Sequence, residues 1–373
     1  MITEINKNQQ PPRTILVAPL DWGLGHTTRC IPVIKQLLQK GYRVILAGEK
    51  NQENLLKTEF PDLEFLYLAG YNIRYGQTAF STFFQLISQI PLIIYSIRRE
   101  NKWLKKMIRL KDIDLVISDN RYGLYHKRIP SVFITHQLMI RQPFGKGAGN
   151  LLQYINYRFI NRFSECWVPD TEGPNGLGGA LSHPGKKPAI PLKYTGPLSR
   201  FSFTGKIKET NRLLIIISGP EPQRSIFENL VIQEIVTFNG YITVVRGLPH
   251  TDTFIPSTGM IQFYNHLPAP MLQEEIEKAG YIISRCGYST VMDLARLQKK
   301  SILVPTPGQT EQEYLADYLS EAGFAYTIGQ KNFRLRESLE AAEKFNYRPI
   351  PVQSEQLLAK AIDGLATLIP SRP

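Results

Sequence analysis

The sequence predicts an α/β protein made of two Rossmann-like, doubly wound domains that face each other across a cleft. Short runs of strand-forming residues alternate with segments of helical apolar spacing along most of the 373 residues. A Gly- and Pro-rich loop at 171–191 interrupts this alternation, and a second series of strands and helices begins at residue 213. We expect an N-terminal domain over 1–200, a C-terminal domain over 201–345, and a final segment over 346–373 whose helix packs back onto the N-terminal domain.

The composition limits the classes of function. A net charge of +12 and a pI near 9.4 indicate an anionic partner, such as nucleic acid, a nucleotide or acidic lipid. Because no nucleic-acid-binding motif accompanies the charge, we expect no nucleic-acid partner. The three cysteines are far apart in the sequence, which indicates neither a disulfide framework nor a zinc site. Residues 1–12 lack the apolar segment of a signal peptide, so we expect a cytoplasmic protein.

Apolar runs and their breaks define the predicted elements. In the first domain, strands are expected at 14–20, 42–49, 112–119, 129–137 and 164–170. A glycine loop at 21–26 leads into a helix over 27–40, where Pro32 is tolerated because it lies in the first turns. In the second domain, strands are expected at 213–219, 241–247, 260–268, 281–283, 301–307 and 325–329, with helices near 335–346 and 355–368.

Two consecutive strand-to-helix corners, at Gly287 and Gly308, indicate a ligand site. Ligands of open α/β sheets bind at the carboxyl ends of the strands, where helix N-termini offer N–H groups to anions, so we expect a phosphate-bearing ligand here. Polar side chains that suit such a ligand are Arg285, Ser289, Thr290, Asp293, Gln312 and Glu313. Alternatively, Ser289 and Thr290 only cap a helix, and the acids at 311 and 313 only complement a helix dipole.

The residues at these corners resemble the donor-nucleotide signature of the MurG-type glycosyltransferases, which have the glycosyltransferase-B fold. The matching segments are SRCGYSTVMD at 284–293 and VPTPGQTEQE at 304–313. In that family, S-R-x-G-x-x-T-x-x-E and a Q-Q pair after a V-P strand hold the UDP-sugar. Asp293 and the pair Gln312-Glu313 depart from the family's Glu and Gln-Gln, so the resemblance does not specify which sugar is bound.

The glycine loop at 21–26 is similar to the G-G-x-G-G-H loop of the same family. A dinucleotide-binding loop is the alternative, but Thr28 occupies the place of the third glycine of G-x-G-x-x-G. The resemblance implies that Gly23 and Gly25 lie beside the donor phosphates and that His26 reaches the cleft as a general base, a role that suits a side chain titrating near neutrality. The simpler alternative is a histidine that bonds its own backbone at a helix start.

Further candidate residues stand where other strands end. Asp119, His136 and Gln137 follow strands of the first domain and are candidates for acceptor contact, although His136 is equally well explained as a buried core residue. The segment GPLSR at 196–200 resembles the G-N-P-V-R that ends the family's first domain, which makes Arg200 a candidate for binding the pyrophosphate. The resemblance also implies donor contacts for Ser218, Gly219, Arg224 and His266, beside Arg285 and the backbone near Gly287.

Residues 80–111 have an unusual composition. An apolar and aromatic stretch with a proline and several polar residues, which argue against a spanning helix, runs into a segment rich in Lys, Arg, Trp, Leu and Met. A basic amphipathic helix of this kind is typical of a membrane-surface contact. The alternative is an ordinary surface helix that is solvated on its basic face and packed through the rest. The resemblance places such a patch in the acceptor domain, where it would suit a lipid-linked acceptor.

The resemblance therefore implies an inverting, metal-independent glycosyltransferase. It would move a hexose or N-acetylhexosamine, N-acetylglucosamine as first choice, from a UDP-sugar bound by residues 201–345 to an acceptor hydroxyl bound by residues 1–200. We expect no cofactor besides the UDP-sugar co-substrate, and a location in the cytoplasm or on the inner face of the cytoplasmic membrane. Expected partners are a nucleotide sugar, a glycan or lipid-linked acceptor, and an anionic membrane surface. The alternatives are a UDP-sugar 2-epimerase and a non-catalytic nucleotide-sugar-binding protein.

Overall fold

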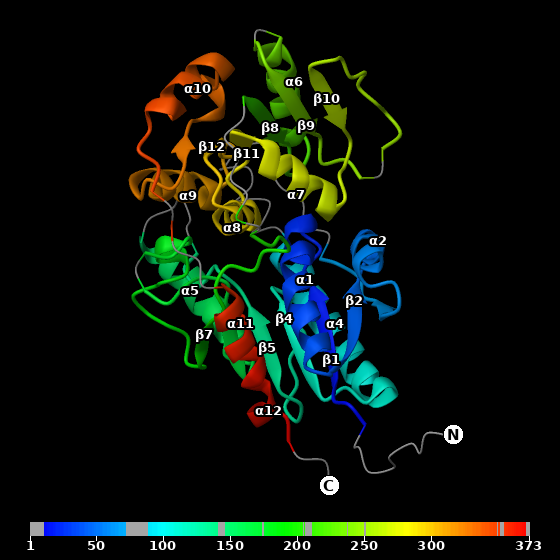
Figure 1. Cartoon of the computed structure of the whole chain (residues 1–373). Helices are drawn as coiled ribbons and strands as arrows, with labels where there is room; N and C mark the ends of the chain where they lie inside the picture. Colours follow the sequence, from blue (N-terminus) through cyan, green and yellow to red (C-terminus); the bar gives the residue numbers. More distant parts are fainter. Residues whose placement is uncertain are drawn as a thin grey trace, which may run out of the picture.

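The computed structural model describes residues 11–71, 89–140, 146–173, 175–203, 205, 211–236, 238–249, 251–348, 350 and 354–370. Within these residues the strands form two parallel sheets, one above the other in Figure 1, and helices cover each sheet. The half with the first sheet is called the N lobe here, and the half with the second sheet the C lobe. The predicted fold class, two Rossmann-like domains facing each other, is confirmed.

The N lobe is built on a sheet whose described strands have the order β3-β2-β1-β4-β5-β6-β7. These strands are β1 (Thr14–Pro19), β2 (Arg43–Gly48), β3 (Glu64–Tyr67), β4 (Leu115–Asp119), β5 (Ser131–Ile134), β6 (Glu165–Val168) and β7 (Leu192–Tyr194). The described helices are α1 (Leu24–Gln39), α2 (Lys50–Glu59), α4 (Ile90–Lys111) and α5 (Lys146–Ile160), with a short 3₁₀ helix η1 (Gly179–Leu181). The central strands β1, β4 and β5 are buried along their whole length, which agrees with the consecutive apolar residues that each contains.

The C lobe is built on a sheet whose described strands have the order β10-β9-β8-β11-β12-β13. These strands are β8 (Arg212–Ile216), β9 (Tyr241–Val245), β10 (Ile261–Tyr264), β11 (Tyr281–Ser284), β12 (Ser301–Leu303) and β13 (Tyr326–Thr327). The described helices are α6 (Gln223–Ile235), α7 (Ala269–Lys278), α8 (Tyr288–Leu297), α9 (Thr310–Glu321) and α10 (Leu335–Lys344), with a 3₁₀ helix η2 (Gln330–Asn332). Two further helices, α11 (Ser354–Asp363) and α12 (Leu365–Leu368), end the chain.

Some N-lobe boundaries differ from the sequence expectations. Helix α1 begins at Leu24 instead of residue 27, because Gly23 adopts a φ of +74° that turns the chain directly from β1 into the helix. Pro32 therefore lies inside α1 and not in its first turns. Strands β3 and β7 are not predicted from the sequence, since edge strands of 4 and 3 residues without a buried residue carry almost no apolar pattern. The earlier start of α1 places His26 in the first turn of a helix.

The strand order brings the predicted corners of the C lobe together. Strands β8, β11 and β12 are parallel neighbours, so Ser218, Gly287 and Gly308, which follow their carboxyl ends, lie at the same edge of the sheet. Residues next to these corners line a pocket shared with the N lobe. The expectation that the corners meet at one edge, facing the other lobe, is therefore confirmed.

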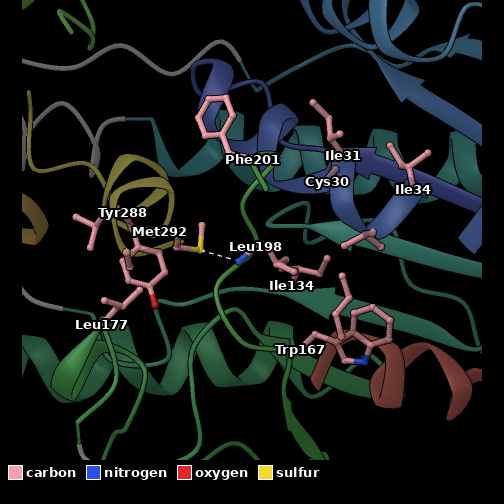
Figure 2. Close-up of a cluster of buried hydrophobic side chains, with 14 of the residues drawn as sticks. Cys30, Ile31, Ile34, Ile134, Trp167, Leu177, Leu198, Phe201, Tyr288 and Met292 are labelled. Atoms are coloured by element: carbon pink, nitrogen blue, oxygen red, sulfur yellow. Dashed lines mark hydrogen bonds between the residues drawn. The ribbon is translucent and has the colours of Figure 1, made fainter. Parts of the chain in front are cut away.

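A continuous cluster of buried apolar side chains joins the two lobes (Figure 2). Leu177 and Leu198 of the N lobe belong to the same cluster as Tyr288 and Met292 of α8. The backbone N–H of Leu198 points at the Met292 sulfur, 3.2 Å away. The two lobes thus share part of one core.

The Gly- and Pro-rich loop at 171–191 also contacts the C lobe. The backbone N–H of Ala180 donates to the Tyr314 hydroxyl at 2.7 Å, and the Tyr318 hydroxyl donates to the carbonyl of Gly176 at 2.6 Å. Both tyrosines belong to α9. This loop therefore fixes α9 against the N lobe.

The end of the chain returns to the N lobe. In Figure 1 the red helices α11 and α12 lie beside the first sheet. The Gln36 side chain donates to the carbonyl of Glu355 at 3.5 Å, and Lys40 pairs with Asp363. Arg13 donates to the carbonyl of Pro370 at 3.0 Å. These contacts attach the terminal segment to α1 and to Arg13, the residue before β1.

Candidate active site

A pocket of 370 Å³ lies between the lobes, at the carboxyl ends of strands from both sheets. Its N-lobe wall consists of Trp22, Gly25, His26, Arg29, Asn120, His136, Gln137, Met139, Ile140 and Leu181. Its C-lobe wall consists of residues 220–223, 288, 289 and 306–311. The wall combines polar side chains with aromatic and aliphatic ones, which is typical of a small-molecule site.

His26 and Asp119 form a pair in this pocket. The His26 Nδ1 lies 2.9 Å from Oδ1 of Asp119, the last residue of β4. The His26 side chain is 14% exposed, whereas Asp119 is fully buried. The sequence analysis names these two residues separately, one as a base and the other as an acceptor-side residue. The structure shows that they contact each other, which leaves Nε2 as the nitrogen that can act on a ligand.

Arg29 completes this buried group. It lies one turn beyond His26 on α1 and is 2% exposed. Its Nε donates to Asp119 Oδ2 at 2.6 Å, and its Nη2 donates to Oδ1. The same Nη2 lies 2.9 Å from Nδ1 of His26. Two groups therefore compete for Nδ1, and the charges decide between them.

Asp119 wins this competition because it is an ionised carboxylate. Burial alone would raise the pKa of Asp119, but Arg29 and His26 hold that pKa well below its usual range. An ionised carboxylate can only accept, so Nδ1 of His26 carries the hydrogen and donates it to Asp119. Burial and the adjacent Arg29 cation lower the pKa of His26 below 6.5, whereas Asp119 acts in the opposite direction. The imidazole is therefore neutral at neutral pH and its Nε2 can accept a proton.

His136 connects the two lobes. Its Nε2 lies 2.7 Å from Oε1 of Glu311 at the start of α9, and its ring stacks on Tyr288 with the ring centroids 4.0 Å apart. Gln137 donates to the other oxygen of the same carboxylate. His136 and Gln137 line the pocket, and in this structure their polar atoms contact Glu311. Their contact with an acceptor stays a prediction.

The N-termini of α1 and α8 meet at the pocket. A Cβ atom on Gly25 would lie 2.5 Å from Oγ and 3.1 Å from Cβ of Ser289, so a side chain at position 25 would require Ser289 to shift. Gly287 is the N-cap residue of α8, and no side chain among the described residues caps this helix. Its first backbone N–H groups can therefore bind an anion.

Comparison with known proteins agrees with this geometry. Residues 262–368 match the glycosyltransferase family 28 C-terminal domain. Over 340 residues the chain is 25% identical to the UDP-N-acetylglucosamine--N-acetylmuramyl-(pentapeptide) pyrophosphoryl-undecaprenol N-acetylglucosamine transferase of Gloeothece citriformis (strain PCC 7424), with 87% of this chain and 84% of that protein covered. The resemblance to the MurG-like glycosyltransferases that the signature residues predict is confirmed by these matches. The chain is a glycosyltransferase, as predicted.

Solved structures show the same glycosyltransferase-B fold as this MurG-like chain. The glycosyltransferase SnogD from Streptomyces nogalater is similar with a TM-score of 0.64 and 13% identity, over 97% of this chain and 100% of that chain. MurG from Acinetobacter baumannii is similar with a TM-score of 0.52 and 14% identity, over 96% and 99% of the two chains. At these identities the likeness concerns the fold alone.

In this MurG-like glycosyltransferase, two of the predicted donor residues line a second hollow on the lobe boundary. The hollow measures 210 Å³, and Arg200 and His266 face residues of α2 across it. The Nε of Arg200 is buried, and no acceptor among the described residues contacts it. A half-buried cation whose buried Nε has no acceptor among the described residues suits an anionic ligand.

Asp293 lies close to Arg200 at the lobe boundary. Its carboxylate accepts a hydrogen bond from the Ser199 hydroxyl at 2.6 Å. Burial raises the pKa of Asp293 to about 6, although Arg200 and Ser199 both act to lower it. In this structure the acid predicted to bind the donor is held by the segment that joins the lobes, and its contact with a ligand stays a prediction.

The predicted phosphate-binding arginines of the C lobe contact the protein itself. Arg285 is 1% exposed, donates to the carbonyl of Gln223 at 2.8 Å and lies over the Phe227 ring. Burial lowers the pKa of Arg285 to about 10. Arg224 donates to Glu221 at 2.5 Å. Both arginines therefore hold the loop that follows β8, and their contact with phosphate stays a prediction.

Gln312 and Glu313 hold the turn that follows β12. The side-chain oxygen of Gln312 accepts from the backbone N–H of Thr306, and that of Glu313 accepts from the N–H of Gly308, each at 2.9 Å. Of the acids in this first turn of α9, Glu311 lines the pocket. Sugar contacts of Gln312 and Glu313 stay predictions.

The remaining predicted positions lie at helix starts and loops near the pocket. Gly23 is the N-cap residue of α1, Thr290 lies in the first turn of α8, and Ser218 and Gly219 follow β8. Residues 220–223, which come next, line the pocket. Ligand contacts of these residues also stay predictions.

Sequence analysis did not select Arg29, Tyr288 or Glu311. Arg29 follows His26 by three positions, so it lies on the same face of α1, and this spacing could have revealed it. Glu311 was interpreted only as an acid that complements the dipole of α9. Nothing in the local sequence indicates whether Glu311 or Glu313 points toward the other lobe. Tyr288 lies within the signature segment, but its stacking partner is far away in the sequence.

No group of three or more His, Cys, Asp or Glu side chains in the described part of the chain is placed to hold a metal ion. The Asp-x-Asp spacing at 112–114 lies before β4, at the end opposite Asp119, and Asp114 accepts from Arg13 at 3.0 Å. None of the helices in the described ranges is both long and apolar enough to cross a membrane.

Proposed function

We propose that this enzyme transfers a hexose or N-acetylhexosamine, N-acetylglucosamine as first choice, from a UDP-sugar to an acceptor hydroxyl with inversion at the anomeric carbon. The observation that carries the proposal is the His26–Asp119 pair in a pocket between two Rossmann-like lobes. The choice of donor is supported by the name of the Gloeothece citriformis relative, a UDP-N-acetylglucosamine-dependent transferase.

The pocket residues supply a general base. Nε2 of His26 takes the proton of the acceptor hydroxyl as the oxygen attacks the anomeric carbon, while Asp119 accepts the Nδ1 hydrogen and stabilises the imidazolium that forms. Attack from the face opposite the leaving nucleotide is a single displacement, which inverts the anomeric configuration. The lowered pKa of His26 keeps the base unprotonated before the reaction.

The C lobe supplies stabilisation for the departing UDP. The uncapped N-terminus of α8 presents backbone N–H groups to the diphosphate, and Arg200 adds a permanent positive charge from the second hollow. We propose that these groups replace a divalent metal. The acceptor would approach from the N-lobe side, past Asn120, His136 and Gln137.

Donor binding should be visible as thermal stabilisation. UDP-N-acetylglucosamine at about 100 times its Kd should stabilise the protein by about 2.7 kcal/mol. UDP-glucose and UDP-galactose at the same concentration should stabilise it less. Chelation with EDTA should leave turnover unchanged, because the charge on UDP is balanced by Arg200 and backbone N–H groups. Differential scanning fluorimetry and UDP-release assays measure the two effects. Absence of any shift with uridine nucleotides, or loss of turnover in EDTA that Mg²⁺ restores, would contradict the proposal.

We also propose that the enzyme acts at the inner face of the cytoplasmic membrane on a lipid-linked acceptor. Helix α4 exposes Leu92 and Tyr95 in its first turns, followed by the exposed basic side chains of Arg98, Lys102 and Lys105. The predicted amphipathic face is only partly available, because Trp103, Leu104, Met107 and Ile108 pack in a core cluster. Residues 80–88 of the predicted patch lie outside the described residues.

Neutralising α4 should release the protein from anionic vesicles. Each Lys or Arg near such a surface contributes about 1 kcal/mol, so the variant Arg98→Gln/Lys102→Gln/Lys105→Gln should bind roughly a hundredfold more weakly in co-sedimentation. Arg99 is left unchanged because it donates to the carbonyl of Gly70 at 3.0 Å.

The matched control removes the same charge from the far end of the C lobe. The variant Lys331→Gln/Arg334→Gln/Arg336→Gln changes three exposed side chains and should sediment like the wild type. If both triple variants bind the vesicles equally more weakly than the wild type, only net charge determines binding. The proposed contact through α4 would then be contradicted.

A further inference from the structure

Glu311 reaches from the C lobe to the N lobe inside the pocket. Its Oε1 lies 2.7 Å from Nε2 of His136, and its Oε2 accepts a hydrogen bond from Gln137. His136 is 4% exposed and is held from the same side by the Tyr288 ring. A carboxylate of one lobe is therefore bonded to a buried histidine of the other.

This contact determines which nitrogen of His136 carries hydrogen. His136 holds the pKa of Glu311 below its ordinary value against the effect of burial, so the carboxylate is ionised and can only accept. Nε2 must then be the protonated nitrogen, and Nδ1 is left as an acceptor. Nη1 of Arg29 lies 3.3 Å from that Nδ1 and donates to it.

Arg29 continues the connection to the base. Its Nε and Nη2 donate to the two oxygens of Asp119, which in turn accepts the Nδ1 hydrogen of His26. In this series the N–H of each histidine faces a carboxylate, that of His136 at Glu311 and that of His26 at Asp119, while Nη2 of Arg29 also lies 2.9 Å from Nδ1 of His26. If His136 adopted the other tautomer, its Nε2 would face the Glu311 carboxylate without a hydrogen to donate, and its Nδ1–H would face Nη1 of Arg29.

We propose that Glu311 is a positioning residue, which fixes the tautomer of His136 and so holds Arg29, Asp119 and the base His26 in line only while the two lobes are in contact. This inference rests on the proposed role of His26 as the base. It differs from a simple latch, because Tyr288, Tyr314 and Tyr318 already hold the lobes together through hydrogen bonds of 2.6–2.9 Å. The donor lobe would thus activate the base that lies on the acceptor lobe.

The test compares Glu311→Ala, which removes the acceptor, with Glu311→Gln, whose amide oxygen can still accept from His136. Glu321→Gln is the matched control, because it makes the same chemical change at an exposed position at the end of α9. Two readouts are needed. The first is kcat and donor KM for sugar transfer. The second is the ¹⁵N chemical shifts of the His26 ring without substrate, which report the tautomer directly and are tractable in a chain with 6 histidines.

Loss of one hydrogen bond to a charged group should lower kcat about tenfold in Glu311→Ala, with donor KM within about twofold of wild type. Glu311→Gln should keep kcat within about threefold. In the NMR spectra, the Nδ1-protonated pattern of His26 should persist in wild type, Glu311→Gln and Glu321→Gln, and should change to a mixture of tautomers in Glu311→Ala.

Unchanged His26 signals in Glu311→Ala would overturn the inference, whatever the activity. A loss of kcat/KM that resides entirely in donor KM would also overturn it, because Glu311 would then act as a donor ligand. The NMR experiment needs no turnover, so it decides this inference even if the wild type proves to transfer no sugar, an outcome that would refute the proposed function separately.

Discussion

Replacing His26 with alanine is expected to lower kcat by about a hundredfold to ten-thousandfold, the range typical of general bases. The reason is that Nε2 of His26 is the pocket nitrogen left free to accept a proton, since Nδ1 is committed to Asp119. Donor KM should change little, because the nucleotide would be held by the C lobe. Steady-state rates of UDP release with saturating acceptor measure both quantities.

His126→Ala is the control for this experiment. His126 lies between β4 and β5, outside the pocket, and accepts a hydrogen bond from the backbone N–H of Arg128 at 3.2 Å. Its removal should leave kcat unchanged. If the His26→Ala variant keeps full turnover, the base is another residue. If the wild-type protein binds the donor but shows no turnover, a non-catalytic binding protein is favoured.

Asp119→Asn should damage both turnover and stability. The substitution leaves the buried Arg29 cation without its partner, which typically costs about 3–5 kcal/mol in the free energy of unfolding. The amide also presents N–H groups to His26 or Arg29, so Nδ1 of His26 is no longer reliably protonated and kcat should fall by at least about a hundredfold. Thermal melting and UDP release measure the two losses.

The pH dependence of stability provides a second readout for Asp119. Its pKa is depressed in the folded protein, so its contribution to stability is complete above about pH 4, the unfolded value, and is lost as the pH falls toward the folded value. The Asp119→Asn variant should lack this acid-sensitive contribution to the free energy of unfolding. Asp363→Asn, which removes an exposed ion pair with Lys40, should change stability by less than about 1 kcal/mol. Equal effects of the two substitutions would contradict the buried-pair account.

The sequence predicts the framework of this site well, because the framework depends on local patterns. The alternation of apolar runs and helical segments predicts both sheets except for the edge strands β3 and β7, and Gly287 marks a real strand-to-helix corner. His26 is identified from the resemblance of its glycine loop to the family's loop, and Asp119 from its place at the end of a strand. The contact between them is not predicted, because it depends on β1 and β4 being neighbours in the sheet. The order of the strands along the chain does not reveal which strands are neighbours.

Other parts of the site depend on how the lobes meet, and local sequence carries no signal for that. Glu313 and Glu311 lie in the same first turn of α9, and only the position of this helix relative to the N lobe brings Glu311 to His136. Arg285 has the chemistry of a phosphate ligand, yet the carbonyl of Gln223 at the start of α6 lies beside it and accepts its hydrogen bond. The start of α1 was missed because one glycine conformation decides it.

The central claim is that donor and acceptor meet in the pocket that contains His26. A crystal structure of His26→Ala with UDP-N-acetylglucosamine tests it most directly, since the variant should bind the donor without consuming it. The account predicts the diphosphate at the N-terminus of α8 and the sugar inside the 370 Å³ pocket, with its anomeric carbon facing position 26. A nucleotide bound outside the lobe boundary, or a sugar directed away from position 26, would contradict it.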